Sequence, residues 1–241
     1  MNSSRLPGKV LLKFDDQTII EYIHQRIKKY SKLVDDVVIA TTSNKSDDAI
    51  INLCLVKDIK YYRGSENNVI QRVIDTAYFF NADIIVDITG DCPFIDPLMI
   101  DQLIEELKDN DYDYISNDVI ERSYPDGFDC QVYHTECLKI AKGLIKDKNH
   151  FNHCGWNIPT YCSEIYDIGN IKAPIEYDLP GLGLTLDEKE DYLFLLKIYN
   201  IFKYQLKKDE PFSMYEIIDY IKKNSEIINN KDVVRKIPGA G

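Results

Sequence analysis

The sequence predicts an α/β fold, in which a mostly parallel sheet carries helices on its faces. Apolar runs of strand length alternate along the chain with stretches in which apolar residues recur at helical spacing. One run, VVIATTS at residues 37–43, is rich in β-branched residues, as expected of a strand buried on both faces. The 241 residues are enough to bury a sizeable core without disulfides or metals.

The individual elements follow from the same patterns. Strands are expected at residues 37–43, 59–64, 82–91, 112–118, 128–134 and 182–187. Helices are expected at residues 19–30, 47–57, 97–108, 135–145 and 189–204, with two more starting near residues 65 and 213. Three helix starts carry capping signals, namely Thr18 with Glu21, Asp96 with Pro97, and Ser213 with Glu216.

The chain is expected to form one domain over residues 1–224. Residues 147–180 contain several glycine and proline breakers and are predicted to be a loop-rich excursion. Residues 225–241 are predicted to form a polar tail. No internal repeat or low-complexity tract suggests a further boundary.

Composition excludes several classes of function. With 29 Lys and Arg against 40 Asp and Glu, the net charge is −11, which argues against a nucleic-acid partner. No apolar run approaches the ~20 residues of a membrane span, and the N-terminus has no apolar region typical of a secretion signal. A cytoplasmic location is therefore expected. The six cysteines form no CxxC pair and are predicted to be buried, reduced thiols.

Two aspartates follow predicted strands and are candidate ligands for Mg²⁺. Asp91 follows the strand at residues 82–91 within the turn Gly90-Asp91-Cys92-Pro93, and Asp187 ends the strand at residues 182–187. Ligands of α/β sheets bind at the carboxyl ends of strands, and Mg²⁺ prefers oxygen ligands. Taken singly, each aspartate is better explained as a turn residue or a helix N-cap.

Three further segments have features of anion or turn sites. The N-terminal stretch contains Ser3, Ser4, Arg5 and Lys9, a set suited to a loop around a phosphate, although a solvated terminus would have the same composition. Arg63-Gly64-Ser65 lies at a strand-to-helix junction, where free backbone N–H groups favour an anion. The segment Tyr124-Pro125-Asp126-Gly127 has the composition of a turn.

Seven ordered motifs together resemble one family. They are SSRLPGKVL, VVIATTS, YRGSENNVIQR, DITGDCPFIDP, YISND, YPDGFD and LTLDEKEDYLFL. Over residues 1–222 the chain resembles the cytidylyltransferases that activate sugars, in the branch of spore-coat polysaccharide biosynthesis proteins, with relatives acting on acylneuraminate and 3-deoxy-manno-octulosonate. This resemblance implies a three-layer sheet of Rossmann-like nucleotide-binding topology, of the nucleotide-diphospho-sugar transferase type.

The resemblance also implies a reaction and roles for particular residues. A sugar or sugar phosphate would attack the α-phosphate of CTP and release pyrophosphate, in a Mg²⁺-dependent reaction serving cell-surface polysaccharide or glycoconjugate synthesis. The implied residues are Arg5 and Lys9 as catalytic cations on the triphosphate; Ser3, Ser4, Thr41, Thr42, Arg63 and Gly64 around the nucleotide; Asp91 and Asp187 as metal ligands; and Asn117, Tyr124, Asp126, Gly127 and His150 near the sugar.

One departure from the family concerns its first strand. Relatives begin with an apolar strand that leads into the signature loop, whereas this sequence opens at Met1 inside that loop. A sheet without that strand would expose unpaired backbone, so we expect low stability or compensating association into a homodimer. Two alternative functions stay open: a glycosyltransferase of related fold that consumes a sugar nucleotide and, because the first strand is missing, a non-catalytic nucleotide-binding protein.

Overall fold

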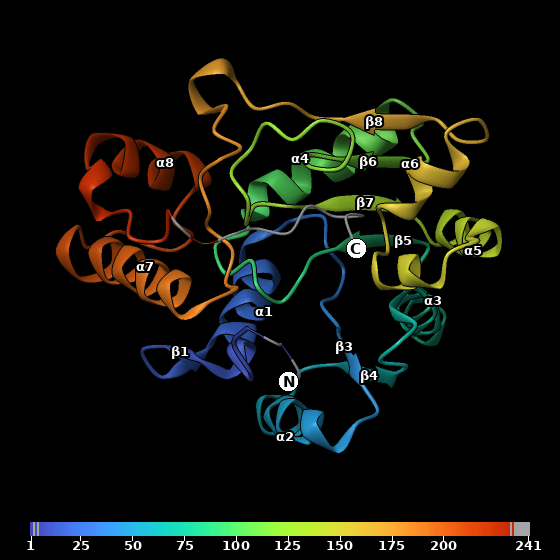
Figure 1. Cartoon of the computed structure of the whole chain (residues 1–241), viewed down its shortest axis with the longest axis horizontal. Coiled ribbons are helices and arrows are strands. Elements are labelled where there is room, and N and C mark those ends of the chain that lie inside the picture. The colour runs from blue at the N-terminus through green and yellow to red at the C-terminus, as the bar shows by residue number, and fades with distance from the viewer. Residues whose placement is uncertain (2, 4, 232, 234–241) are drawn as a thin grey trace.

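The computed structural model describes residues 1, 3, 5–231 and 233 and has an α/β architecture (Figure 1). The strands are β1 (Lys13–Phe14), β2 (Gln17–Thr18), β3 (Ile39–Thr42), β4 (Tyr61–Gly64), β5 (Ile84–Asp87), β6 (Tyr114–Ser116), β7 (Gln131–His134) and β8 (Ile168–Asn170). The helices are α1 (Ile19–Tyr30), α2 (Asp48–Lys57), α3 (Val69–Phe80), α4 (Pro97–Asp109), α5 (Thr135–Leu144), α6 (Asn157–Cys162), α7 (Lys189–Asn200) and α8 (Met214–Lys223).

The capping signals read from the sequence are confirmed. The Thr18 side chain accepts from the backbone N–H of Glu21 at the start of α1, and Asp96 accepts from Leu98 N at the start of α4. Ser213 and Glu216 form a capping box at α8. These signals are local, since each satisfies backbone N–H groups within the same first turn.

The main sheet is mixed, which corrects the prediction of a mostly parallel one. Its strand order is β5-β7-β6-β8; β7 runs antiparallel to both β5 and β6, whereas β8 runs parallel to β6. No helix separates β6 from β7 among the described residues. The chain therefore reverses direction in the loop between them, and a parallel pair would need a longer crossover.

The excursion and its flanks also differ from the sequence prediction. Residues 182–187 form no strand; an isolated bridge joins Gly183 to Asp126, and Leu184 N donates to Asp126 O. Leu184 and Leu186 are buried, but the segment lies against loops rather than a sheet neighbour. The excursion supplies an unpredicted strand, β8, at the edge of the mixed sheet.

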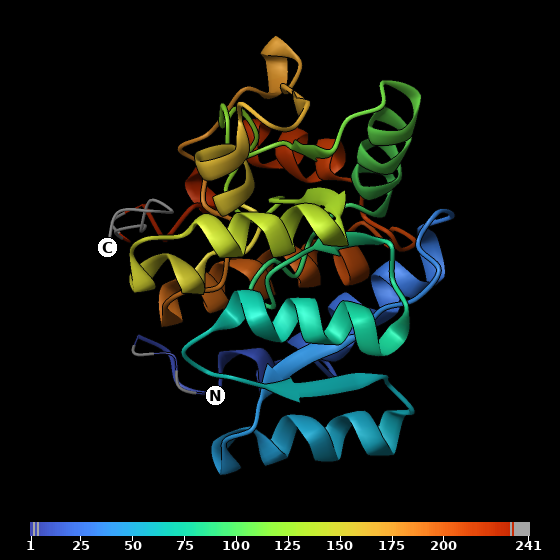
Figure 2. The same ribbon diagram turned by 90° about the vertical axis from the view of Figure 1, so that its right-hand side faces the viewer.

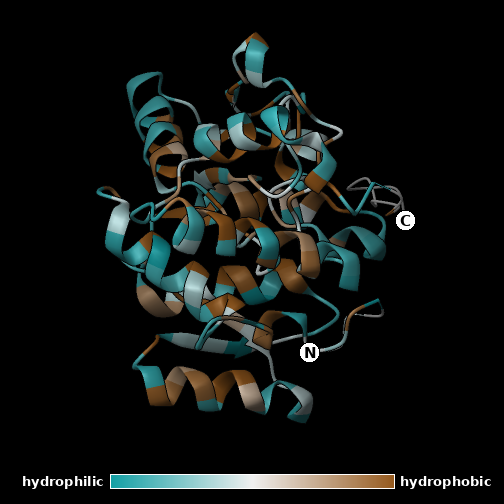
Figure 3. Ribbon diagram, turned by 90° about the vertical axis from the view of Figure 1, so that its left-hand side faces the viewer, coloured by the Kyte–Doolittle hydropathy of each residue, from teal (hydrophilic) through white to brown (hydrophobic). Residues whose placement is uncertain are grey.

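Helices cover both faces of the mixed sheet (Figure 2). Ile115 and Val132 belong to the core formed with α1, α4, α7 and α8, whereas their neighbours Tyr114 and Tyr133 belong to the core formed with α3, α5 and α6. This alternation is the two-residue period of strands. The helices in Figure 3 carry both hydrophobic and hydrophilic residues, as expected of helices with one side against the core and the other toward solvent. All six cysteines are buried as free thiols, as predicted.

A cavity of about 440 Å³ separates the two sets of strands. Within the described part of the chain, β3 pairs only with β4, and β5 pairs only with β7. Apolar residues of β3, β5, α1 and α3 line the space, and two buried atoms on its walls, His24 Nδ1 and Arg72 Nε, have no hydrogen-bond partner among the described residues. The unpaired edges expected from the sequence therefore face this cavity.

None of the helices described is both long enough and apolar enough to cross a lipid bilayer.

Candidate active site

The N-terminal loop leads two cations to the edge of the sheet. Gly8 has φ +72°, a left-handed conformation that favours glycine, and a short 3₁₀ turn, Lys9–Leu11, follows it. Leu6 N donates to Ser3 Oγ at 3.4 Å, so the serine hydroxyl stabilises the loop. Ser4, also predicted to contact the nucleotide, lies outside the described residues.

Lys9, Asp91 and Asp187 meet at one point. Lys9 Nζ donates to Asp91 Oδ2 at 2.6 Å and to Asp187 Oδ1 at 3.1 Å. Arg5 joins them through an ion pair of 2.9 Å to Asp187 and a longer one of 3.5 Å to Glu188. Between 15% and 26% of the Arg5, Lys9, Asp91 and Asp187 side chains is exposed, so a ligand can reach them.

The two aspartates shape the electrostatics of Lys9. Burial by itself would lower the pKa of Lys9, but the charges and hydrogen bonds of Asp91 and Asp187 outweigh it and raise that pKa above its usual value. Lys9 therefore stays protonated at neutral pH and acts as a fixed positive charge.

Backbone and hydroxyl contacts hold Asp91 in place. Thr89 Oγ1 donates to the carboxylate, and Asp91 O accepts from Leu186 N at 2.8 Å. Because Leu186 immediately precedes Asp187, the same contact ties the two aspartates together. This explains how Asp187 reaches the site although no strand precedes it.

Asp191 positions Asp187 and was not identified from the sequence. It is fully buried, and its Oδ2 accepts from Asp187 N at 3.0 Å and Glu188 N at 2.9 Å. Its other oxygen accepts from Asn230 at 2.7 Å. The spacing Glu188-x-x-Asp191, a capping box at the start of α7, is the sequence signal that could have revealed it.

The other residues predicted to bind the nucleotide stabilise the loop after β3. The hydroxyls of Thr41 and Thr42 both donate to Asp47 at 2.7 Å. Arg63 donates to the backbone oxygens of Thr42 and Asn44 and forms a 2.8 Å ion pair with Asp48. Gly64 faces Arg72, whose side chain would lie 2.7 Å from an added Cβ. In the contacts among described residues, Arg63 does not join Arg5 and Lys9.

Most of the residues predicted to contact the sugar are engaged within the fold. Asn117 is fully buried, donates to Phe128 O at 2.8 Å and accepts from Cys130 N at 2.9 Å. Tyr124 is 2% exposed. Gly127 has φ +113°, and an added Cβ would lie 2.4 Å from the backbone of Leu184. These three residues thus have structural contacts, whereas the Asp126 side chain is 20% exposed.

His150 lies in an aromatic group within the excursion. Its Nδ1 lies 2.6 Å from the Tyr161 hydroxyl, and its ring packs edge-on against Trp156 at 5.0 Å between centroids. Its backbone oxygen accepts from Asn157. None of these partners belongs to the group around Lys9.

The donor set of Asp91 and Asp187 fits a hard divalent cation. Both carboxylates are partly exposed, and both already contact one shared cationic group, the ammonium of Lys9. Two oxygen-donor side chains at the edge of an α/β sheet are typical of Mg²⁺ sites that a substrate phosphate completes. The described residues contain no group of three or more His, Cys, Asp or Glu arranged for a metal, so water or substrate phosphate would complete the coordination of such an ion.

An α/β fold whose loop cations meet two carboxylates at the sheet edge has the features of a site for a phosphate-bearing ligand. Residues 1–124 match the sequence profile described as cytidylyltransferase. An uncharacterised protein of Methanocaldococcus jannaschii is 33% identical over 240 residues, 97% of this chain and 92% of that protein. The chain belongs to the cytidylyltransferase family.

Two further relatives agree with this assignment. The spore coat polysaccharide biosynthesis protein SpsF of Bacillus subtilis is 28% identical, covering 96% of this chain and 95% of that one. The solved structure of a cytidylyltransferase from Leptospira borgpetersenii has 31% identity and a TM-score of 0.85, and covers 98% of this chain and 95% of its own. The match thus extends over nearly the whole fold.

Proposed function

We propose that this protein transfers a cytidylyl group from CTP to a sugar or sugar phosphate for the synthesis of a cell-surface polysaccharide or glycoconjugate. The observation that carries the proposal is the meeting of Arg5 and Lys9 with Asp91 and Asp187. The Bacillus relative is a spore coat polysaccharide biosynthesis protein, which supports a sugar as the acceptor. The cytidylyltransferase family supports a cytidine nucleotide as the donor.

The reaction breaks the phosphoanhydride bond between the α- and β-phosphates of CTP and links the α-phosphorus to an acceptor oxygen instead. An acceptor oxygen forms a bond to the α-phosphorus of CTP, the bond from that phosphorus to the bridging oxygen breaks, and pyrophosphate leaves with the electron pair. The proton of an acceptor hydroxyl passes to solvent, whereas a sugar phosphate attacks through an oxygen already ionised. Such transfers depend mainly on positioning and on neutralising charge.

The residues of the loop would supply most of that charge. Lys9 is a fixed cation and would contact an oxygen of the triphosphate as a point charge. Arg5 is suited to hold two phosphate oxygens through its planar guanidinium. Asp191 keeps Asp187 in place through two backbone hydrogen bonds. A Mg²⁺ ion held by Asp91 and Asp187 would supply further neutralisation of the triphosphate.

The test is pyrophosphate release from CTP with Mg²⁺ and a panel of sugars and sugar phosphates. Lys9→Ala and Asp91→Asn should lower kcat/KM by about a hundredfold or more, as expected for groups that stabilise transition-state charge. The matched control is Lys60→Ala. Lys60 is an exposed lysine whose ion pair is with Asp36 and not with a residue of the proposed site. Release of a nucleotide from an added sugar-nucleotide donor, with no pyrophosphate formed from CTP, would instead indicate a glycosyltransferase. CTP binding without turnover would indicate a binding protein.

A further inference from the structure

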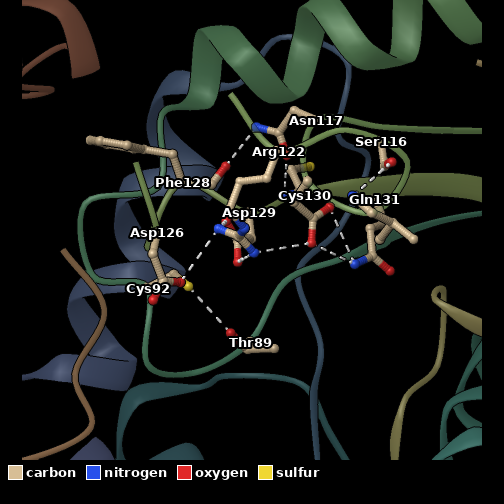
Figure 4. Close-up of polar contacts among 12 residues, drawn as sticks. Thr89, Cys92, Ser116, Asn117, Arg122, Asp126, Phe128, Asp129, Cys130 and Gln131 are labelled. Carbon is tan, nitrogen blue, oxygen red and sulfur yellow. Dashed lines mark hydrogen bonds and ion pairs between the residues drawn. The ribbon is translucent and has the colours of Figure 1, made fainter. Parts of the chain in front are cut away.

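A second charged cluster lies beside the site and was not identified from the sequence. Arg122, in the loop after β6, donates through both terminal nitrogens to Asp129, at 2.7 and 2.8 Å (Figure 4). Asp126 lies 3.6 Å from the same guanidinium, and Asp118 lies 3.8 Å from it. We call Arg122, Asp118, Asp126 and Asp129 the Arg122 cluster.

The Arg122 cluster is adjacent to the proposed reaction centre. The segment 182–186 contacts both, because Leu184 N donates to Asp126 O at 2.6 Å and Leu186 N donates to Asp91 O at 2.8 Å. Figure 4 shows Thr89 and Cys92 on one side of Arg122, with Gln131 on the other.

The charge of the Arg122 cluster is negative. One guanidinium faces three carboxyl groups. Burial raises the pKa of Asp118 to about 8, so this carboxyl is largely neutral at pH 7. The carboxylates of Asp126 and Asp129 remain, which leaves about one net negative charge.

The cluster offers acceptor atoms more readily than donor atoms. Both terminal nitrogens of Arg122 already donate to Asp129 in a two-point arrangement. The side chains of Asp126 and Asp129 are 20% and 22% exposed, so a ligand can reach them. An incoming carboxylate would have to displace Asp129 from Arg122 and would lie beside Asp126, whereas a hydroxyl or ammonium group could donate to an Asp129 oxygen while Asp129 stays paired with Arg122.

We propose that Arg122, Asp126 and Asp129 select the acceptor, and that they favour a sugar presenting hydroxyl or amino groups over one presenting a carboxylate. This inference rests on the proposed function, because it assigns the acceptor side of that site. The Arg122–Asp129 pair is the specificity-determining feature, because Asp129 occupies the guanidinium that the carboxylate of a sugar acid would otherwise bind.

The test compares three acceptors that differ by one group. With CTP and Mg²⁺ fixed, glucose 1-phosphate, glucosamine 1-phosphate and glucuronic acid 1-phosphate are each assayed for pyrophosphate release, and their binding is measured by calorimetry. The neutral and amino sugars should exceed the uronic acid by about tenfold or more in kcat/KM and in affinity. Asp129→Asn, which removes one negative charge and loosens the hold on Arg122, should narrow this ratio.

The control is Glu121→Gln, which removes the same charge one position from Arg122. Glu121 is largely exposed and pairs with Lys172, so the ratio should stay as in the wild type. Equal or tighter binding of the uronic acid by the wild type would overturn the inference, as would binding of none of the three sugars. Selective sugar binding without pyrophosphate release would uphold it and reject the proposed reaction instead.

Discussion

Lys9 Nζ lies 2.6 Å from Asp91 Oδ2 and 3.1 Å from Asp187 Oδ1, so one ammonium group compensates two carboxylates. A lysine and a divalent cation that share the same ligands compete for them. The same lysine would also be the group that contacts the triphosphate. Its two roles can be separated, because they respond oppositely to its removal.

Lys9→Ala should therefore bind a divalent cation more tightly while losing turnover. Without the ammonium, Asp91 and Asp187 lose a compensating charge, and we expect affinity for Mn²⁺ alone to rise by about tenfold. Calorimetric titration with Mn²⁺ measures this change, and Lys60→Ala, from a surface ion pair, should match the wild type. Weaker Mn²⁺ binding in Lys9→Ala would mean that the two aspartates are not the metal ligands.

Asp191→Asn should affect both stability and metal use. The substitution turns an oxygen that accepts from Asp187 N and Glu188 N, or the one that accepts from Asn230, into a donor. A buried mismatch of this kind costs about 1–3 kcal/mol. Denaturant titration measures this loss in the free energy of unfolding. In activity assays, the Mg²⁺ concentration that gives the half-maximal rate should rise. Glu190→Gln, exposed in the same helix turn, should change neither quantity.

The convergence of Asp91 and Asp187 could be predicted from the sequence because strand-end carboxylates meet at one sheet edge. The structural reason differs from the predicted one, however. Asp187 follows a loop segment, not a strand, and the Leu186 N–H holds that segment against Asp91. The helix starts were predictable for a simpler reason: caps such as Thr18 act within one turn. The direction of β7 was not predictable, because strand pairing depends on partners far along the chain.

The contacts that residues of the proposed acceptor side make within the fold could not be predicted from the sequence. Asn117 and Tyr124 have residue types suited to sugar contacts, but their burial depends on contacts with distant segments, which no local pattern reveals. Arg122 was overlooked because a single charge in a loop has the same local sequence whether it is solvated or paired with three aspartates.

Gly127→Ala should destabilise the fold strongly. Gly127 has φ +113°, and an added Cβ would lie 2.4 Å from the backbone carbon of Leu184, which cannot shift without disturbing the link to Asp126. We expect a loss of more than about 2 kcal/mol in the free energy of unfolding. The control is Gly143→Ala in α5, where nothing lies within 4 Å of the added carbon. That variant should gain about 0.5–1 kcal/mol.

The pH dependence of stability should carry the signature of Asp118. Burial and the charge of Asp129 raise its pKa in the folded protein to about 8, although Arg122 acts in the opposite direction. In the unfolded chain Asp118 titrates near pH 4. Between these values the folded state holds a proton that the unfolded state lacks, so this contribution to stability is complete below about pH 4 and is lost as pH rises through about 8.

Comparison with Asp118→Asn isolates that contribution. The wild-type free energy of unfolding, relative to that of the variant, should fall by at most about 1.4 kcal/mol per pH unit between pH 5 and 7.5. Urea titrations across this range provide the measurement, with Glu121→Gln as the variant expected to follow the wild-type curve. A difference that is flat with pH would show that Asp118 is ionised in the folded protein.

The cavity between β3 and β5 should accept additional side-chain volume. Ala77, on α3, is 5% exposed and lines this space of about 440 Å³. Ala77→Leu would place three more carbon atoms against the apolar wall, and we expect a gain of about 1–2 kcal/mol in the free energy of unfolding.

Ala141→Leu is the matched control, because Ala141 is fully buried in the packed core on α5. There the same added volume forces neighbours apart and should cost about 1–3 kcal/mol. Opposite signs for the two variants in denaturant titrations would establish that the cavity is present in solution, since a closed sheet would make both substitutions unfavourable.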